Sequence, residues 1–431
     1  MGKTRTLSLR MRESWEKHAE ELLSDIGHDS INFSAVLHPD TPQSSDLVEE
    51  TSKLLVKSSR RPALFNYQKE IVAKVLESLP QTGGLLALPT GAGKTRAALA
   101  ICLEGICNQK LNRIVWLATT GELIDQAYAS AISLYEMHGG IDKLFLSKSL
   151  TENPQNPGVP TIIFTTPQAV YQRAQRGKGL SQKPSLVIFD EAHQLGARTF
   201  NIAVSSLGCL DKNNPVPLLG LSATPGRSSE TETEDLVKLF NGRLLTSESL
   251  GTNPIQSLEQ MGVLSKIEFK TIPTKVAPGP DLRPRLQITY NLCKRLVQRR
   301  QSHPLVFAPS VDAAIALAAV LNETGFRADA IHSGLDPEIR RNAIGRFADG
   351  STDVLTNHRI LATGYDCPAV SDVIFVNEVG SAIQFEQMVG RACRGTKTGG
   401  SYKSTVWEFD DHRQLHGLPQ SYRRYSDFRW E

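Results

Sequence analysis

Short runs of consecutive apolar residues recur along the chain, with longer helix-like stretches between them. In the first half these runs are LLAL (85–88), RIVWLAT (113–119), TIIFTT (161–166), LVIFD (186–190) and PLLGLSAT (217–224). Continuous rather than alternating apolar residues are typical of strands that are covered on both faces. This pattern predicts a parallel sheet with crossover helices.

A second series of the same kind occupies the second half of the chain. Its runs are PLVFAP (304–309), ADAIH (328–332), DVLT (353–356), DVIFVNE (372–378) and TVWEF (405–409). Two series predict two doubly wound α/β domains in tandem, because each parallel sheet needs helices on both of its faces.

The segments outside these two series set the expected domain boundaries. The stretch TIPTKVAPGPDLRP (271–284) is rich in proline and is the best candidate for a linker, while residues 1–60 contain no series of strands. We therefore expect an N-terminal accessory extension (1–60), a first domain (61–270), a linker (271–285), a second domain (286–420) and a C-terminal tail (421–431).

Composition narrows the class of protein only slightly. The net charge of +3 over 431 residues permits a polyanionic partner without requiring one. The six cysteines form no CxxC pair, which argues against a zinc module and against a disulfide framework. No apolar run approaches the roughly 18 residues of a membrane span, and the N-terminus lacks the core of a signal peptide. We expect a cytoplasmic, bacterial protein with no membrane partner.

The segment LPTGAGKT (88–95) has the context of a phosphate-binding loop, because it follows an apolar run and opens a stretch of good helix formers. Glycines let backbone N–H groups turn toward an anion, and the new helix presents its positive end. The lysine can reach the β- and γ-phosphates of ATP, and the threonine can ligate Mg²⁺. Leu88 stands where the strict pattern has glycine. The candidate cofactor-binding residues are Pro89, Thr90, Gly91, Ala92, Gly93, Lys94 and Thr95.

The segment VIFDEAHQLGA (187–197) places two acids and a histidine directly after an apolar run. One interpretation is that the strand simply reaches the surface there. The other is that Asp190 shares Mg²⁺ with Thr95 while Glu191 orients and deprotonates the attacking water. His193 would then couple this site to a neighbouring motif. The phosphate loop about a hundred residues upstream favours the second interpretation.

These two motifs, with others in a fixed order, resemble superfamily 2 helicases of the DEAH-box type over residues 62–419. The resemblance implies two tandem RecA-like domains. It assigns LFNYQKE (64–70) to adenine recognition through Gln68. Within LSATP (221–225), it assigns Ser222 and Thr224 to the coupling between the ATP state and the grip on a strand.

Two motifs of the second domain complete the resemblance. VLTNHRILATGYDCP (354–368) implies nucleotide contacts by Gly364 and Asp366, although Asn357 stands where an acid is usual. QMVGRACR (387–394) implies that two arginines approach the γ-phosphate when the domains close. Their charge would raise the rate of ATP hydrolysis by roughly 10³–10⁵-fold. These are Arg391 and Arg394, which share one face if the segment is helical, with Gln387 one turn earlier as a coupling residue. The alternative is that both arginines are exposed and pair with Glu386 or solvent.

Nucleic-acid contacts are expected from groups that read the backbone rather than the bases. The candidates are Thr119, Thr166, Thr356 and Thr363. We expect DNA rather than RNA as the partner, although an RNA-dependent activity stays open because nothing in the sequence reads a 2′-hydroxyl.

Two further segments, SLEQMGVLSKIEF (257–269) and VWEFDDHRQLHGLP (406–419), are similar to type III restriction subunits and RadD-type repair helicases. The resemblance implies an ATP-dependent DNA helicase or translocase that uses ATP and Mg²⁺. The alternative is a regulatory motor subunit that drives or gates a nuclease, or another defence or repair subunit, without separating strands.

Overall fold

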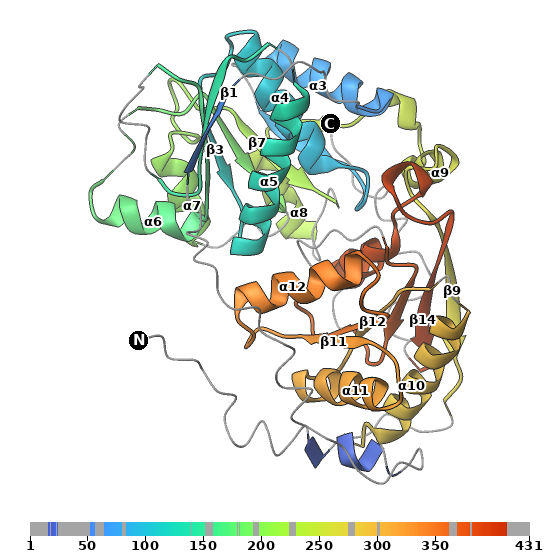
Figure 1. Ribbon diagram of the computed structural model, residues 1–431. Coiled ribbons are helices and arrows are strands. Elements are labelled where there is room, and N and C mark those ends of the chain that lie inside the picture. Colours follow the sequence, from blue (N-terminus) through green and yellow to red (C-terminus); the bar gives the residue numbers. More distant parts are fainter. Residues whose placement is uncertain are drawn as a thin grey trace. The chain divides into compact units, whose positions relative to one another are not determined.

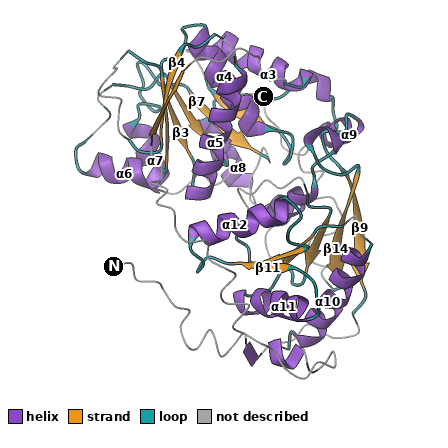
Figure 2. Cartoon of the chain, viewed as in Figure 1, coloured by secondary structure: helices purple, strands orange, loops and turns teal. Residues whose placement is uncertain are grey.

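The computed structural model describes two compact units (Figure 1). The described residues are 16–17, 19–22, 24, 52–56, 64–79, 83–138, 140–150, 158–178, 180, 182–192, 198–223, 230–274, 281–299, 302–361, 369–379 and 382–411. The first lobe contains those between Val48 and Leu258, and the second lobe contains those from Glu259 onward together with residues 16–24. Each lobe has a central sheet with helices packed around it (Figure 2). Within these ranges, every helix is too short or too polar to cross a lipid bilayer.

The first lobe is built on an eight-stranded sheet with the order β1-β4-β5-β3-β6-β7-β2-β8. Its strands are β1 (Ser52–Val56), β2 (Gly84–Ala87), β3 (Arg113–Leu117), β4 (Lys143–Ser147), β5 (Thr161–Thr165), β6 (Leu186–Phe189), β7 (Leu218–Ser222) and β8 (Leu244–Leu245). The helices of this stretch of chain are α3 (Asn66–Ser78), α4 (Lys94–Cys107), α5 (Gly121–Met137), α6 (Pro167–Gln175), α7 (Arg198–Ser206), α8 (Glu230–Leu239), η2 (Glu248–Leu250) and α9 (Pro254–Gln260).

All neighbouring strands of this sheet are parallel except β1 and β4, which pair in antiparallel register. The inner strands β2, β5, β6 and β7 are buried along their whole length, as expected for strands with helices on both faces. No series of strands was expected in residues 1–60, and the segment SKLLV from this region adds the single edge strand β1 to the first sheet.

The second lobe is built on a six-stranded sheet with the order β11-β12-β10-β13-β14-β9. Its strands are β9 (Lys266–Ile272), β10 (Pro304–Phe307), β11 (Ala328–Ile331), β12 (Val354–Asn357), β13 (Asp372–Phe375) and β14 (Lys403–Phe409). Its helices are α10 (Arg283–Gln298), α11 (Val311–Glu323), α12 (Pro337–Ala348), α13 (Ala382–Val389), η3 (Gly390–Ala392) and η4 (Thr396–Thr398). All five strand pairs are parallel. The predicted tandem of doubly wound parallel sheets is therefore confirmed.

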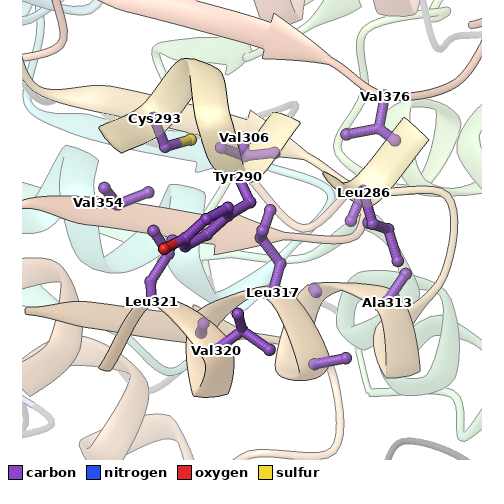
Figure 3. Close-up of a cluster of buried hydrophobic side chains, with 14 of the residues drawn as sticks. Leu286, Tyr290, Cys293, Val306, Ala313, Leu317, Val320, Leu321, Val354 and Val376 are labelled. Carbon is purple, nitrogen blue, oxygen red and sulfur yellow. The ribbon is translucent and has the colours of Figure 1, made fainter. Parts of the chain in front are cut away.

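The core of the second lobe lies between its sheet and the helices α10 and α11. Leu286 and Tyr290 of α10 and Leu317 of α11 lie in one buried cluster with strand residues such as Val306 and Val354 (Figure 3). Alanine recurs along α11, in AAIALAA, and its small side chain lets the helix pack closely on the strands.

Two residues near the N-terminus contribute to the same core. Ala19 and Leu22 lie three residues apart in helical backbone, are fully buried, and join the cluster that contains Leu286 and Tyr290. A carboxylate oxygen of Glu21 also lies 3.9 Å from Nε of Arg283. The predicted accessory extension thus supplies part of the second lobe, which is formed from two separate stretches of the sequence.

The boundary between the lobes differs from the expected one at residue 270. Strand β9 pairs with β14 along its whole length, from Lys266 beside Lys403 to Ile272 beside Phe409. Residues 259–270 were expected to end the first domain, but they belong to the second lobe. The proline-rich stretch after β9 therefore connects two elements of one lobe. Its sequence alone could not reveal this, because the partner strand lies over a hundred residues away.

Candidate nucleotide-binding site

Three neighbouring strands of the first lobe bring the predicted nucleotide-binding residues to one edge of the sheet. Strands β6, β7 and β2 are adjacent and parallel, so their carboxyl ends face the same side. Asp190 follows β6, Ser222 ends β7, and the glycine-rich loop follows β2. The backbone N–H of Leu88 donates to the carbonyl of Ser222 at 3.2 Å, which joins the start of the loop to the end of β7. Ligands of parallel α/β sheets bind at this edge.

The loop itself has backbone angles that favour glycine. Gly91 has φ +89° and Gly93 has φ +78°, both in the left-handed region. The loop closes through a hydrogen bond from Ala92 N–H to the Pro89 carbonyl at 3.0 Å, and α4 begins at Lys94 directly after Gly93. A turn that ends in the amino terminus of a 14-residue helix presents several N–H groups to an anion. The predicted phosphate contacts of this loop stay predictions.

Asp190 is buried, with 4% of the residue exposed. Burial raises its pKa to about 7, and the charge of Glu191 adds to this effect. The charge of Lys94 opposes the shift, as does the Glu191 N–H that donates to Oδ1 at 3.1 Å. A nearby cation stabilises the ionised form of a buried carboxylate. Lys94 does so only in part, because the effects of burial and of Glu191 are larger.

The donor set at this edge fits Mg²⁺. Among the described residues no group of three or more His, Cys, Asp or Glu side chains is arranged to hold a metal. Mg²⁺ in phosphoryl-transfer sites needs fewer protein ligands, since nucleotide phosphates and water complete its shell. The Asp190 carboxylate and the Thr95 hydroxyl, in the first turn of α4, are oxygen ligands of the kind that Mg²⁺ prefers.

Glu191 has an unusual backbone conformation for a residue other than glycine. Its φ is +56°, and its side chain is buried. Such a conformation costs of order 1–3 kcal/mol and persists only where the surrounding structure requires it. Here the sharp turn directly after β6 places two successive carboxyl groups at the same edge of the sheet.

Gln68, predicted to read adenine, lies on α3 against the phosphate loop. Its Nε2 donates to the carbonyls of Ala92 at 3.2 Å and Gly93 at 3.3 Å, and its Oε1 accepts from Phe65 N–H at 3.0 Å. The adenine contact stays a prediction. Tyr67, the residue before it, was not among the predicted site residues, but its hydroxyl donates to the same Ala92 carbonyl at 2.8 Å. The only sequence signal for Tyr67 is its place beside Gln68.

Two of the residues predicted to contact nucleic acid lie at the same edge of the first sheet. Thr119 and Thr166 follow the adjacent parallel strands β3 and β5, which pair as far as Leu117 beside Thr165. Both threonines are half-buried, and the Thr166 hydroxyl accepts the Ala169 N–H at 3.1 Å as the N-cap of α6. The predicted phosphate contacts of both residues stay predictions.

Thr356, the corresponding candidate in the second lobe, has a different environment from the expected one. It is fully buried in β12, and its hydroxyl donates to the Ala314 carbonyl of α11 at 2.8 Å. A phosphate contact through this hydroxyl therefore has no support in the structure. The next residue, Asn357, is also buried and donates to the Val306 carbonyl at 3.0 Å. The amide joins β12 to β10, a role that an acid without an N–H donor could not take.

The two arginines of the sixth motif do not lie on one continuous helix. Gln387 is buried on α13, which ends at Val389, and Arg391 lies in the short turn η3. Arg394 follows that turn, where its backbone bridges Leu264 in antiparallel fashion. The expectation that Arg391 and Arg394 share one face of a helix is therefore wrong. Their approach to the γ-phosphate stays a prediction that concerns both lobes together.

Several predicted site residues lie outside the described ranges. They are His193, Thr224, Thr363, Gly364 and Asp366. Their predicted roles in coupling, strand contact and nucleotide binding remain predictions.

Comparison with known proteins places both lobes among helicases. Residues 61–227 match the family model "Type III restriction enzyme, res subunit", and residues 288–396 match "Helicase conserved C-terminal domain". The ATP-dependent DNA helicase MPH1 of Kluyveromyces lactis is 27% identical over 53% of this chain, which spans only 24% of that relative. The DEAD-box ATP-dependent RNA helicase CshB of Staphylococcus aureus is 26% identical over 77% of this chain and 69% of its own length.

Solved structures share the fold. Saccharomyces cerevisiae Dbp5 bound to RNA and ADP BeF3 matches with a TM-score of 0.59 at 18% identity, over 84% of this chain and 88% of that one. A fragment assigned as the HsdR subunit of a type I restriction enzyme from Vibrio vulnificus matches with a TM-score of 0.61 at 18% identity, over 86% and 68%. The two parallel-sheet lobes are thus tandem RecA-like folds. The chain belongs to the superfamily 2 helicases, a family of ATP-dependent enzymes, and within it is similar to the subunits of type III restriction enzymes.

Proposed function

We propose that the chain is an ATP-dependent helicase or translocase that acts on DNA and hydrolyses ATP with residues of both lobes. The observation that carries this proposal is the convergence of the phosphate loop, Ser222 and the Asp190–Glu191 pair at one edge of the first sheet. Fold and family alone do not specify a reaction. The site adds the chemical groups that phosphoryl transfer needs.

In the proposed site, each residue has one task. Lys94 neutralises charge on the β- and γ-phosphates, and Thr95 and Asp190 hold Mg²⁺. The metal, when bound, would neutralise charge that develops on the phosphate oxygens. Glu191 positions the attacking water and accepts its proton. The N–H groups of the phosphate loop hold the phosphates in place, so that catalysis is mostly positioning.

The second lobe would contribute Arg391 and Arg394 to the γ-phosphate when the lobes close. Arginine suits this task because its planar fork matches phosphate oxygens. Closure that requires both ATP and a bound strand would make hydrolysis depend on nucleic acid. In this proposal Ser222 and Gln387 pass the state of the nucleotide to the strand-binding residues, among them Thr119 and Thr166.

ATP turnover measured with single-stranded DNA, double-stranded DNA, RNA and no nucleic acid tests the proposal. We expect single-stranded DNA to raise turnover by about tenfold or more and RNA to raise it less. The Lys94→Ala variant should be inactive in all four conditions. Equal wild-type turnover in the four conditions would overturn the proposed function, and stimulation by RNA alone would replace DNA with RNA as the substrate.

A second candidate is a regulatory motor subunit that drives a nuclease without separating strands. The match of the first lobe to the res subunit model and the fold shared with the HsdR fragment favour it. Displacement of a labelled strand from a tailed duplex separates the two candidates. A helicase releases the labelled strand as ATP is consumed, whereas the motor subunit consumes ATP on DNA and releases none.

A further inference from the structure

Helix α3 brings two hydrogen-bond donors to a single carbonyl of the phosphate loop. The Tyr67 hydroxyl donates to the oxygen of Ala92 at 2.8 Å, and Nε2 of Gln68 donates to the same oxygen at 3.2 Å. Tyr67 and Gln68 are each 1% exposed, so water does not compete for these bonds. The carbonyl of Ala92 is therefore held firmly against α3.

The donors are themselves fixed by contacts around the start of α3. The ring of Phe65 stacks on the ring of Tyr67, with centroids 5.7 Å apart and planes at 7°. The Glu70 carboxylate accepts hydrogen bonds from the Ser247 hydroxyl and, at 3.3 Å, from the Ser249 N–H. These contacts tie α3 to the segment after β8, so that the helix is a rigid support for the loop.

Because the peptide bond is planar and trans, the fixed Ala92 carbonyl also determines the direction of the Gly93 N–H. In a trans peptide the C=O and N–H point in opposite directions, so a fixed Ala92 carbonyl makes the Gly93 N–H point away from α3. Gly93 has φ +78°, and a Cβ at this position would lie 2.6 Å from Nε2 of Gln68. The backbone angle favours glycine here, and a larger residue would also displace the Gln68 amide from its hydrogen bonds.

We propose that Tyr67 is a positioning residue whose hydroxyl orients the Ala92–Gly93 peptide for phosphate binding. This inference rests on the proposed function and deepens it, because it assigns a task in nucleotide binding to a residue that the phosphate contacts do not include. Tyr67 acts through the loop, and so its effect concerns phosphates rather than the base. It should be the same for ATP and ADP if both are held by the Gly93 N–H.

The Tyr67→Phe variant removes the hydroxyl and keeps the ring that stacks on Phe65. We expect its KM for ATP to rise about fivefold while kcat changes less than about twofold, since loop N–H groups bind the phosphates before and during reaction alike. The Kd for ADP, measured by titration calorimetry, should rise by a similar factor. The ratio of kcat/KM for ATP to that for GTP should not change.

Tyr135→Phe is the matched control. Tyr135 is also 1% exposed, and its hydroxyl donates to the Ile141 carbonyl at 3.1 Å, at the far end of α5 from the loop. The two variants lose equivalent buried hydrogen bonds and should lose similar thermal stability. A merely structural role of Tyr67 predicts the same KM in both variants, and that result would overturn the inference.

Failure of the inference and failure of the proposed function give different results. If the wild-type protein binds no nucleotide in calorimetry, both are wrong. If it binds ADP but nucleic acid never stimulates turnover, the proposed function is wrong, and a weaker Kd in Tyr67→Phe still supports the inference.

If Tyr67→Phe does not fold, Phe65→Leu removes the stacked ring and keeps the hydroxyl. Its Kd for ADP should then rise about twofold, and an unchanged Kd would overturn the inference.

Discussion

The backbone N–H of Glu191 donates to Oδ1 of Asp190 at 3.1 Å, so the two carboxyl groups are held next to each other at the end of β6. The bond stabilises the ionised form of Asp190, whereas burial and the charge of Glu191 oppose it. Burial and the charge of Glu191 have the larger effect, and the pKa of Asp190 rises to about 7. A cation that binds beside Asp190 therefore stabilises the ionised form of its carboxyl group.

The first prediction concerns stability without nucleotide or metal. Because the folded-state pKa of Asp190, about 7, exceeds its ordinary value of 3.8, the native state binds the proton more tightly between these pH values. The free energy of unfolding should therefore fall as pH rises from about 4 to about 7. Asp190→Asn cannot titrate, and we expect it to be more stable than wild type at pH 8, by an amount on the order of a few kcal/mol. Urea unfolding at pH 4 and pH 8 measures the difference.

Asp349 provides a control of opposite sign. Hydrogen bonds from Ser351 hold the pKa of this exposed carboxyl below its ordinary value. Asp349→Asn should therefore lose a little stability at pH 8 rather than gain it. If Asp190→Asn is also destabilised at pH 8, protein groups already stabilise the ionised carboxylate without a metal. The raised pKa attributed to burial and to Glu191 would then be wrong.

The second prediction concerns the pH dependence of magnesium-nucleotide binding. Since Asp190 must lose its proton to ligate Mg²⁺, binding should release protons below about pH 7 and strengthen as pH rises through this value. Calorimetry in two buffers of different ionisation enthalpy measures the protons released. Asp190→Asn should release fewer protons under the same conditions, and equal release in both proteins would exclude Asp190 as the titrating ligand.

The third prediction concerns the N-terminal residues packed into the second lobe. Leu22 is fully buried beside Leu286 and Tyr290, so Leu22→Asp places an uncompensated charge in that core. We expect a loss of about 3 kcal/mol or more in the free energy of unfolding. The exposed neighbour Glu20, changed to Gln, is the control and should have little effect. Wild-type stability in Leu22→Asp would show that the extension does not contribute to the lobe.

The fourth prediction separates a core hydroxyl from a nucleic-acid contact. Thr356→Val removes the bond to the Ala314 carbonyl and should cost about 1 kcal/mol of stability. The affinity for single-stranded DNA should stay unchanged, because no phosphate contact is lost. A several-fold weaker affinity in Thr356→Val would restore the phosphate contact that the sequence suggested.

The arrangement of the candidate nucleotide site could be predicted in large part because its segments are local in sequence. The glycine-rich loop and the Asp190–Glu191 pair each directly follow an apolar run, and parallel strands bring such carboxyl ends to one edge. The two-domain division and the parallel sheets followed from the same runs. The sequence pattern therefore predicted the features that depend on short segments and on the common direction of the strands.

The features that escaped prediction depend on contacts between distant residues. Strand β1 has only three consecutive apolar residues and stands apart from both series of apolar runs, and the pairing of β9 with β14 joins segments over a hundred residues apart. Nothing in the sequence around Ala19 and Leu22 indicates which lobe they pack on. The hydroxyl of Tyr67 and the amide of Gln68 gain their positions only when α3 lies against the loop, and helical periodicity marks Tyr67 simply as a buried residue.

The Glu191→Gln variant, compared with wild type for ATP binding and for turnover in the presence of single-stranded DNA, separates nucleotide binding from hydrolysis. Glutamine keeps the shape of the side chain but cannot accept the proton of the attacking water. We predict that the Kd for ATP stays within about threefold of wild type while kcat falls by about 10²–10⁴. A Glu191→Gln variant that hydrolyses ATP at the wild-type rate would show that hydrolysis does not take place at this edge of the first sheet.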